Sequence, residues 1–163
     1  MHDEAGFRAF VEAEGATLQH AARLLTGDHH RAEDLVQTAL TRVYLKWSRI
    51  DAPLAYARRA LVSAHIDASR RRWWGERPTA ELPEPEVADS ASYAYDLRDE
   101  LRRLLAELSP RERAVVVLRF YCDLSERDTA DTLGIPLGTV KSSCARALAR
   151  MRVDATSAAG GSS

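Results

Sequence analysis

The densest group of chemically active side chains is a run of basic residues that ends in two aromatic ones. Arg70, Arg71 and Arg72 are followed directly by Trp73 and Trp74. Arginine binds phosphate groups and an indole ring stacks on an exposed base, so this combination is typical of proteins that hold a single nucleic-acid strand. The run is equally compatible with tryptophans that cover the protein's own core and arginines that are only solvated. The run alone does not decide between these two interpretations.

A second group lies near the C-terminus, where apolar residues recur three and four positions apart, as on one side of a helix. These apolar positions are Leu137, Val140, Cys144, Leu148 and Met151. The other side carries Thr139, Lys141, Ser142, Ser143, Ala145, Arg146 and Arg150. No acidic residue belongs to that second set. Small polar and basic side chains without carboxylates suit a helix that approaches phosphates and base edges.

The sequence offers little for catalysis or metal binding. His29 and Glu33 are four positions apart at a predicted helix start, but no third ligand is close, and acidic residues are common at helix N-termini. There is no phosphate-binding glycine loop, no HExxH motif, and no serine or cysteine nucleophile with an evident partner. We therefore predict that the chain is not an enzyme and has no metal site and no cofactor.

The stretch from Leu124 to Arg152 predicts two helices joined by a tight turn. Ser125 is a good N-cap for the first helix, Gly134 supplies a left-handed residue that ends it, and Pro136 follows as a stop. This pattern predicts a helix-turn-helix whose second helix contacts DNA. An ordinary helical hairpin with a solvated basic face is the alternative.

The remaining pattern predicts an all-α protein made of two small helical domains. In the first, three helices are expected over Glu4–Leu25, His29–Arg49 and Leu54–Trp74. The second has four helices, and its first carries leucines up to Leu108. A capping box at Ser109-Pro110-Arg111-Glu112 then starts a buried helix containing Val115–Leu118, Phe120 and Tyr121. The helix-turn-helix completes this domain.

An acidic, proline-containing connector separates the two domains. The predicted boundaries are 1–74 for the first domain, 75–96 for the linker, 97–153 for the second domain and 154–163 for a disordered tail. The net charge of −1 hides the distribution, since the two domains are mildly basic and the linker carries the acidic excess. An extended linker of about 20 residues reaches roughly 65 Å, enough for the two domains to occupy separate sites on one DNA.

Composition also indicates where in the cell the protein acts. The 163-residue chain is 45% hydrophobic and 29% charged, and no apolar run approaches the roughly 20 residues of a membrane span. The N-terminus has no apolar signal segment, and Cys122 and Cys144 lack metal-type spacing. We expect reduced cysteines, no membrane insertion and a cytoplasmic, nucleoid-associated protein.

Taken together, these stretches resemble the extracytoplasmic-function (ECF) group of bacterial sigma-70 factors, and within it the SigE-like actinobacterial type. Residues 31–37 (RAEDLVQ) resemble region 2.2, residues 56–72 (YARRALVSAHIDASRRR) resemble regions 2.3 and 2.4, and residues 108–152 resemble region 4, including the GTVKS stretch at 138–142. The order and spacing of these stretches make the resemblance specific, and it covers nearly the whole chain.

The resemblance implies partners and site residues. The partners would be core RNA polymerase, through its β′ clamp and β subunit, and promoter DNA; an anti-sigma factor is common in the family but leaves no mark in this sequence. Polymerase binding would involve Asp34, Leu35, Gln37 and Arg42. The melted minus-ten strand would meet Arg58, Arg59, Ser63, His65, Asp67, Arg70 and Arg71. The minus-thirty-five duplex would meet Arg111, Arg113, Thr139, Lys141, Ser142, Ala145 and Arg146.

These implications make the chain a transcription initiation factor that binds core RNA polymerase and directs it to promoters. Two alternatives stay open from the residues. One is a stand-alone helix-turn-helix regulator whose first domain senses a ligand. The other is an adaptor that sequesters other proteins and makes no DNA contact.

Overall fold

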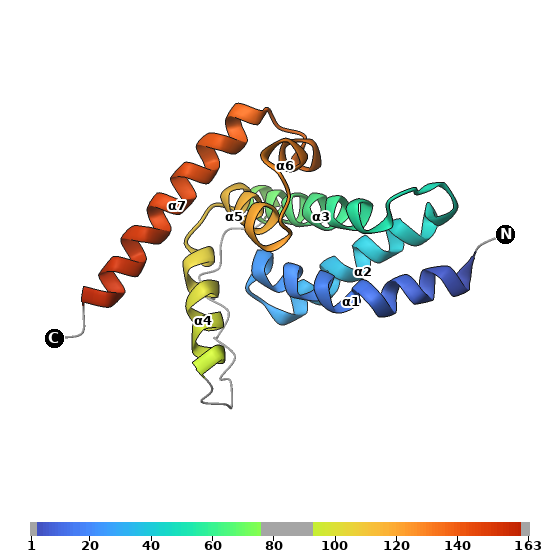
Figure 1. The fold of residues 1–163 in the computed structure, drawn as a ribbon, viewed down its shortest axis with the longest axis horizontal. Helices are drawn as coiled ribbons and strands as arrows, with labels where there is room; N and C mark the ends of the chain where they lie inside the picture. Colours follow the sequence, from blue (N-terminus) through green and yellow to red (C-terminus); the bar gives the residue numbers. More distant parts are fainter. Residues whose placement is uncertain (1–2, 76–92, 161–163) are drawn as a thin grey trace.

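The computed structural model of the chain describes residues 3–75 and 93–160, with side chains described for 3–71 and 100–152. Every regular element within these ranges is a helix, so the predicted all-α class is confirmed (Figure 1). The predicted linker lies mostly outside the described residues. None of the described helices is long and apolar enough to cross a membrane.

The first lobe consists of α1 (Glu4–Thr26), α2 (His29–Leu45), a short 3-10 turn (Trp47–Arg49) and α3 (Pro53–Gly75). Local caps set the boundary between the first two helices. Gly27 adopts the left-handed conformation, with φ of 69°, and ends α1. Asp28 then caps α2 by accepting a hydrogen bond from the His30 N–H at 3.0 Å. Both residues have the types that their conformations favour.

The second lobe consists of α4 (Tyr93–Ala106), α5 (Pro110–Val116), a π-helical turn η2 (Val117–Tyr121), α6 (Glu126–Leu133) and α7 (Leu137–Gly160). Ser109 caps α5, and its Oγ accepts from the Glu112 N–H at 3.2 Å. Ser125 caps α6 in the same way, through the Asp128 N–H at 3.0 Å. Gly134 ends α6 with φ of 66°, so the predicted turn between α6 and α7 is present.

Three details differ from the expectations. The helix expected to bury Phe120 and Tyr121 turns π-helical at Val117, and these two rings are 55% and 38% exposed, because the wider turn shifts them out of the buried stripe. Ser143, expected on the outer side of α7, is completely buried. Finally, α7 continues to Gly160, past the expected start of the tail at 154. Alanines at 155, 158 and 159 favour this continuation.

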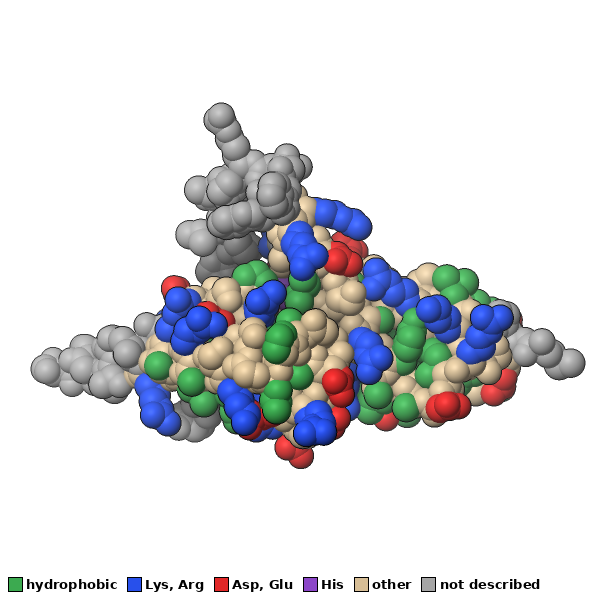
Figure 2. Space-filling view, turned by 90° about the horizontal axis from the view of Figure 1, so that it is seen from above, with side chains coloured by type: hydrophobic (Ala, Val, Ile, Leu, Met, Phe, Trp, Pro, Cys, Tyr) green, Lys and Arg blue, Asp and Glu red, His purple; other side chains and the backbone are tan. Residues whose placement is uncertain are grey.

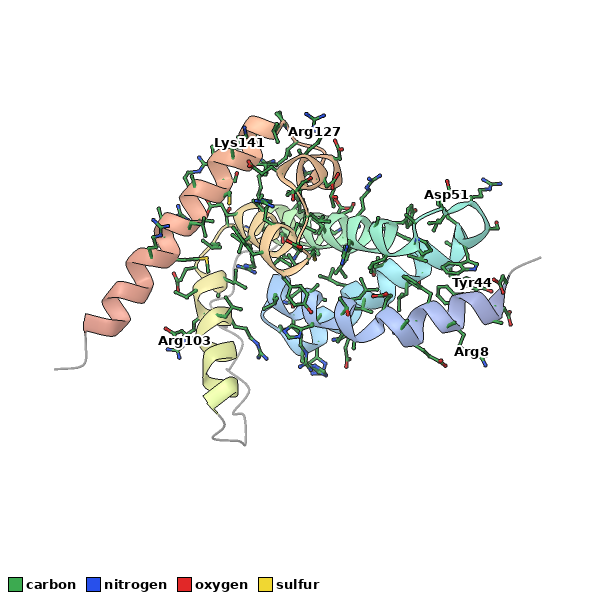
Figure 3. The ribbon with its side chains drawn as sticks, viewed as in Figure 1. Arg8, Tyr44, Asp51, Arg103, Arg127 and Lys141 are labelled. Carbon is green, nitrogen blue, oxygen red and sulfur yellow. The ribbon has the colours of Figure 1, made fainter. Side chains whose placement is uncertain are left out.

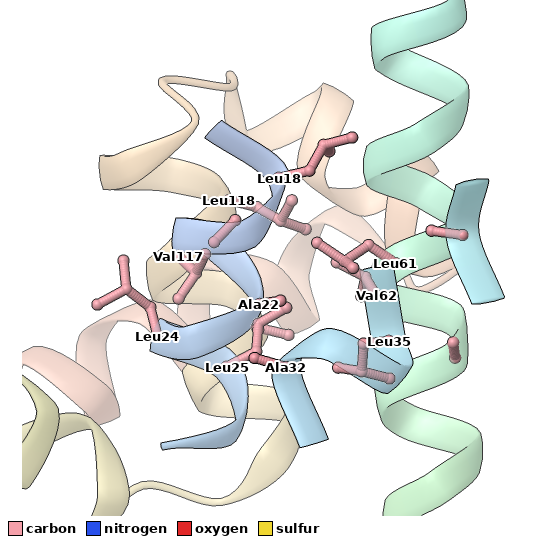
Figure 4. Close-up of a cluster of buried hydrophobic side chains, with 14 of the residues drawn as sticks. Leu18, Ala22, Leu24, Leu25, Ala32, Leu35, Leu61, Val62, Val117 and Leu118 are labelled. Atoms are coloured by element: carbon pink, nitrogen blue, oxygen red, sulfur yellow. The ribbon is translucent and has the colours of Figure 1, made fainter. Parts of the chain in front are cut away.

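The two lobes share one hydrophobic core. Figure 4 shows Val117 and Leu118 of η2 beside Leu18 and Leu24 of α1, and all four side chains are at most 7% exposed. The contact between the lobes, which we call the interlobe contact, joins α1 and α3 to α4, α5, η2 and α6. A buried apolar contact of this kind stabilises the docked arrangement.

Polar groups also cross the interlobe contact. Arg113 of α5 donates to the Leu25 carbonyl of α1 at 2.6 Å and to the Leu105 carbonyl of α4 at 2.8 Å. The rings of His20 and Tyr121 lie 5.1 Å apart. The guanidinium of Arg113 therefore satisfies carbonyls at the C-terminal ends of two helices, one from each lobe.

Candidate nucleic-acid interface

Among the described side chains of α7, residues 137–152, one narrow stripe is buried and the opposite side is exposed and carries polar and small residues. Val140, Ser143 and Ala147 have no exposed surface and are spaced three and four positions apart. On the other side Lys141, Ser142, Ala145 and Arg146 are exposed, and their spacing places them on one helix face. Thr139 is half-buried beside them. The structure thus brings all five predicted α7 residues to one side of the helix.

The turn before α7 is held by local contacts and a small core. Val115, Ala130 and Val140 form a buried cluster that joins α5, α6 and α7. The Ile135 N–H donates to the Ala130 carbonyl at 3.1 Å, which closes the turn after α6. These contacts fix the direction in which α7 leaves α6, as a helix-turn-helix requires.

Some basic residues near α7 are exposed, and others contact groups of the protein itself. Lys141 and Arg127 lie at the end of the molecule where α6 and α7 meet (Figure 3), and both are exposed. Arg150, assigned from the sequence to the outer face, instead pairs with Glu112 of α5, with Nη1 and Oε2 3.3 Å apart. Among the two predicted α5 residues, Arg111 is exposed whereas Arg113 is directed at backbone carbonyls in the interlobe contact.

The helix α3 divides its predicted residues between two sides. One side is exposed or half-buried and carries a stripe spaced four, four and three positions apart. This α3 stripe consists of Arg59, Ser63, Asp67 and Arg70, with Arg71 exposed next to it. Arg58 and His65 belong to the other side. His65 is only 2% exposed and lies among the core residues, whereas Arg58 is half-buried.

Arg58 lies beside the π-helical turn of the second lobe. Burial raises the pKa of the Cys122 thiol, and the charge of Arg58 and its hydrogen bond to Cys122 act in the opposite direction. Burial also raises the pKa of Tyr121, again with Arg58 opposing. Arg58 therefore contacts the second lobe in this arrangement, although the sequence assigns it to a nucleic-acid strand.

The weak apolar periodicity of α3 has a structural reason. Helices α1, α2, α5 and α6 all contact it, so apolar and small residues are needed on several sides. The buried residues include Ala57, Ala60, Leu61, Val62 and Ala64. A helix that is buried over most of its circumference loses the simple one-sided pattern of a surface helix.

The predicted α2 residues are mostly accessible. Asp34 and Gln37 are exposed and Arg42 is half-buried, whereas Leu35 is 6% exposed and belongs to the core. Sequence reasoning missed Leu45, the last residue of α2, whose side chain is 69% exposed. The sequence did contain a signal for this exposure, because Leu45 lies outside the apolar stripe of α2 and such a leucine does not reach the core.

The possible metal pair at the start of α2 has other partners. His29 Nε2 lies 2.9 Å from Glu33 Oε1, and His29 Nδ1 lies 2.5 Å from the Arg23 Nη2. Within the described residues, no group of three or more His, Cys, Asp or Glu side chains is assembled for a metal ion. These contacts favour a structural role for His29 in holding the start of α2 against α1.

Comparison with known families identifies both lobes. Residues 10–75 match the family described as Sigma-70 region 2, and residues 98–151 match Sigma-70, region 4. The RNA polymerase sigma-E factor of Streptomyces avermitilis is 42% identical over 149 residues, which cover 90% of this chain and 83% of the relative. The ECF RNA polymerase sigma factor SigL of Mycobacterium tuberculosis is 31% identical and covers 90% of this chain and 86% of its own length.

Solved structures agree with these sequence matches. The sigma factor RpoE of Bartonella quintana, solved in complex with the anti-sigma factor NepR, aligns with a TM-score of 0.74 and 25% identity. The alignment covers 90% of this chain and 94% of that one. CnrH, solved with the cytosolic domain of CnrY, shares the fold with a TM-score of 0.68, at 21% identity and over 95% of this chain and 90% of its own.

Proposed function

The chain belongs to the ECF group of the sigma-70 family, and from this premise we propose that it binds core RNA polymerase and directs it to specific promoters. The observation that carries the proposal is the presence of regions 2 and 4, in that order, on a chain that covers most of the length of sigma-E factors. The polymerase supplies the chemistry, and the sigma factor supplies recognition. Its place of action is the cytoplasm, where promoter DNA and polymerase meet.

For the duplex at the minus-thirty-five element, we propose α7 as the reading helix. Lys141, Ser142, Ala145 and Arg146 are exposed on one face and Thr139 borders it. Arg146 is long enough to reach a guanine edge with two hydrogen bonds, whereas Lys141 and Arg111 suit phosphate contacts. Arg113 is available for a phosphate only after it leaves the interlobe carbonyls.

For the melted minus-ten strand, we propose the α3 stripe. Arg59, Arg70 and Arg71 would hold phosphates while Ser63 and Asp67 offer hydrogen-bonding groups to unstacked bases. Arg58 faces the second lobe and His65 lies in the core, so direct contact of these two residues with the strand requires the lobes to move apart.

For the polymerase, we propose α2 as the main contact. Asp34, Gln37 and Arg42 present charged and amide groups to the β′ clamp, and Leu45 adds an exposed apolar anchor next to them along the helix. Buried Leu35 would support this surface from beneath. The β subunit would bind the second lobe. An anti-sigma factor is a further proposed partner, because RpoE was solved with one.

Run-off transcription with purified core polymerase of the source organism tests this proposal. Because the promoter sequence is unknown, the template is a pool of genomic fragments, and transcripts are sequenced. We expect promoter-dependent transcripts only when the chain is added, and co-elution of the chain with core polymerase. Duplex binding without co-elution would indicate a stand-alone regulator, and binding to neither DNA nor polymerase would indicate an adaptor.

Arg146→Ala with the matched change Arg103→Ala sharpens the assay. Both arginines are exposed, but Arg103 belongs to α4 and lies far from Lys141, which marks the start of α7 (Figure 3). We expect Arg146→Ala to alter which promoters are transcribed while co-elution with polymerase is retained. Arg103→Ala should leave the promoter set as it is.

A further inference from the structure

A pocket of about 290 Å³ lies between α1 and α4, at the interlobe contact. Gln19, His20, Arg23 and Leu24 line it from α1, and Leu101 and Arg102 line it from α4. Its size lies at the lower end of the range for small-molecule sites. Neither the promoter contacts nor the polymerase contacts proposed above use these residues.

Two side-chain donors at this pocket lack an acceptor. Gln19 Nε2 and Arg23 Nε are both withdrawn from solvent and have no hydrogen-bond partner within the structure. The rest of the Arg23 guanidinium is fixed, since its Nη2 contacts His29. Buried donors without acceptors carry a free-energy cost, and a ligand with acceptor oxygens removes it once these two side chains rotate toward the pocket.

The lining is positively charged and apolar, without any carboxylate. Arg23 and Arg102 come from opposite lobes, and His20 is held by its ring contact with Tyr121 of η2. Guanidinium groups match the planar or tetrahedral oxygens of carboxylates and phosphates. The leucines on both sides lower the local dielectric constant and strengthen such contacts.

We propose that this pocket binds a small oxyanion, a carboxylate or phosphate compound, between the two lobes. Arg23 and Gln19 hold it from α1, and Arg102 holds it from α4. Because residues of both lobes contact the same ligand, its binding favours the docked arrangement over a separated one. By linkage, any partner that separates the lobes weakens ligand binding by the same factor.

Calorimetric titration of the full-length chain with inorganic pyrophosphate, and in parallel with succinate, tests the proposal and separates the two sources of oxygen ligands. We expect saturable one-to-one binding of at least one probe. Amide hydrogen exchange should then slow in the pocket-lining parts of α1 and α4. Saturation by succinate alone assigns the site to carboxylates, and by pyrophosphate alone to phosphates. If neither probe saturates, the proposal is wrong.

Matched arginine variants show whether the probe occupies this pocket. Arg102→Gln should weaken binding by about tenfold or more, as expected for loss of a charged hydrogen-bonding group. Arg103→Gln removes the same charge from the next residue of α4, whose exposed side chain points away from α1 (Figure 3), and should preserve binding. Equal losses of affinity in both variants would mean that the probe binds through non-specific charge attraction, and this result would overturn the proposal.

A third variant leaves the charge unchanged. Gln19→Leu keeps the approximate side-chain volume and removes the carboxamide with its unpartnered Nε2. We expect a several-fold loss of affinity with the same salt dependence as the unchanged protein. Unchanged affinity would exclude Gln19 from the site, and thermal unfolding of each variant verifies that its fold is intact.

Discussion

The two proposed DNA surfaces differ in how they are available. On α7, four of the five proposed residues are exposed together while the lobes are docked. On α3, the stripe from Arg59 to Arg70 is accessible, but Arg58 contacts the second lobe and His65 lies in the core. In the docked protein the residues proposed for the duplex are therefore accessible together on α7, with Arg113 held in the interlobe contact, whereas the set proposed for the single strand lacks Arg58 and His65.

The difference follows from the positions of the two helices. At its described side chains, α7 buries one stripe, whereas α3 is central and contacts helices of both lobes. Figure 2 shows Lys and Arg side chains spread along the viewed face of the molecule rather than gathered over one helix. If the proposed roles hold, we expect duplex binding to precede separation of the lobes and complete strand binding to follow it.

The largest expected effect comes from weakening the shared core. Leu118 of η2 is 1% exposed and packs in the core that joins the lobes. Leu118→Ala should lower the free energy of unfolding by about 2–5 kcal/mol, through lost burial and a residual cavity. Urea unfolding measures this change. Leu45→Ala is the control, because Leu45 is 69% exposed and its truncation should cost less than about 0.5 kcal/mol. Similar costs for the two variants would contradict the shared core.

A second test concerns the exposed α7 surface. Arg146→Ala should remove about 1–3 kcal/mol of discrimination between a cognate minus-thirty-five duplex and one with a changed base pair, if Arg146 contacts a base edge. Competition binding at fixed salt measures this ratio. Arg127 is exposed on α6, and Arg127→Ala should weaken binding to both duplexes by the same factor. If Arg127→Ala loses discrimination and Arg146→Ala does not, the surface that contacts the bases is not on α7.

Features set by neighbouring residues could be predicted from the sequence, and contacts between distant segments could not. Ser109, Ser125 and Gly134 occupy the predicted caps, because each acts on its own helix end. Arg113 illustrates the limit, since its carbonyl partner on Leu25 lies 88 residues away in the chain. No feature of the neighbouring sequence distinguishes such an arginine from one that binds a phosphate group.

The same limit applies to the buried sides of α3 and α7. Ser143 is polar, so the sequence placed it on the outer face, yet the close approach of α7 to its neighbours requires a small residue there. The acidic linker suggested independent lobes, and only the packing of η2 on α1 shows that they share a core.

A smaller effect is expected at the turn that orients α7. Ser125→Ala removes the hydroxyl that accepts from the Asp128 N–H, and should cost about 1 kcal/mol of unfolding free energy. Urea unfolding measures the loss. Ser142→Ala is the matched control, since its exposed hydroxyl only donates to the Thr139 carbonyl of its own helix. A larger cost in the control than in Ser125→Ala would show that the cap is not what holds α6.

The smallest effect is a pH dependence of the interlobe contact at Cys122. Burial raises the pKa of this thiol above its ordinary value of 9.0, so the folded state favours the protonated form. As the pH rises, the unfolded thiol ionises first. The contribution to stability is therefore complete below the ordinary pKa and is lost as the pH rises through the raised one.

Cys122→Ser, which does not titrate there, should lose less unfolding free energy than the unchanged protein between about pH 8 and about pH 10. Burial and the nearby Cys122 thiolate both raise the pKa of Tyr121, so Cys122→Ser also removes part of that shift, and this second effect acts in the same direction. Arg58→Gln should steepen the dependence, because the Arg58 charge favours the thiolate. Parallel pH profiles in all three proteins would mean that Cys122 is not enclosed between the lobes in solution.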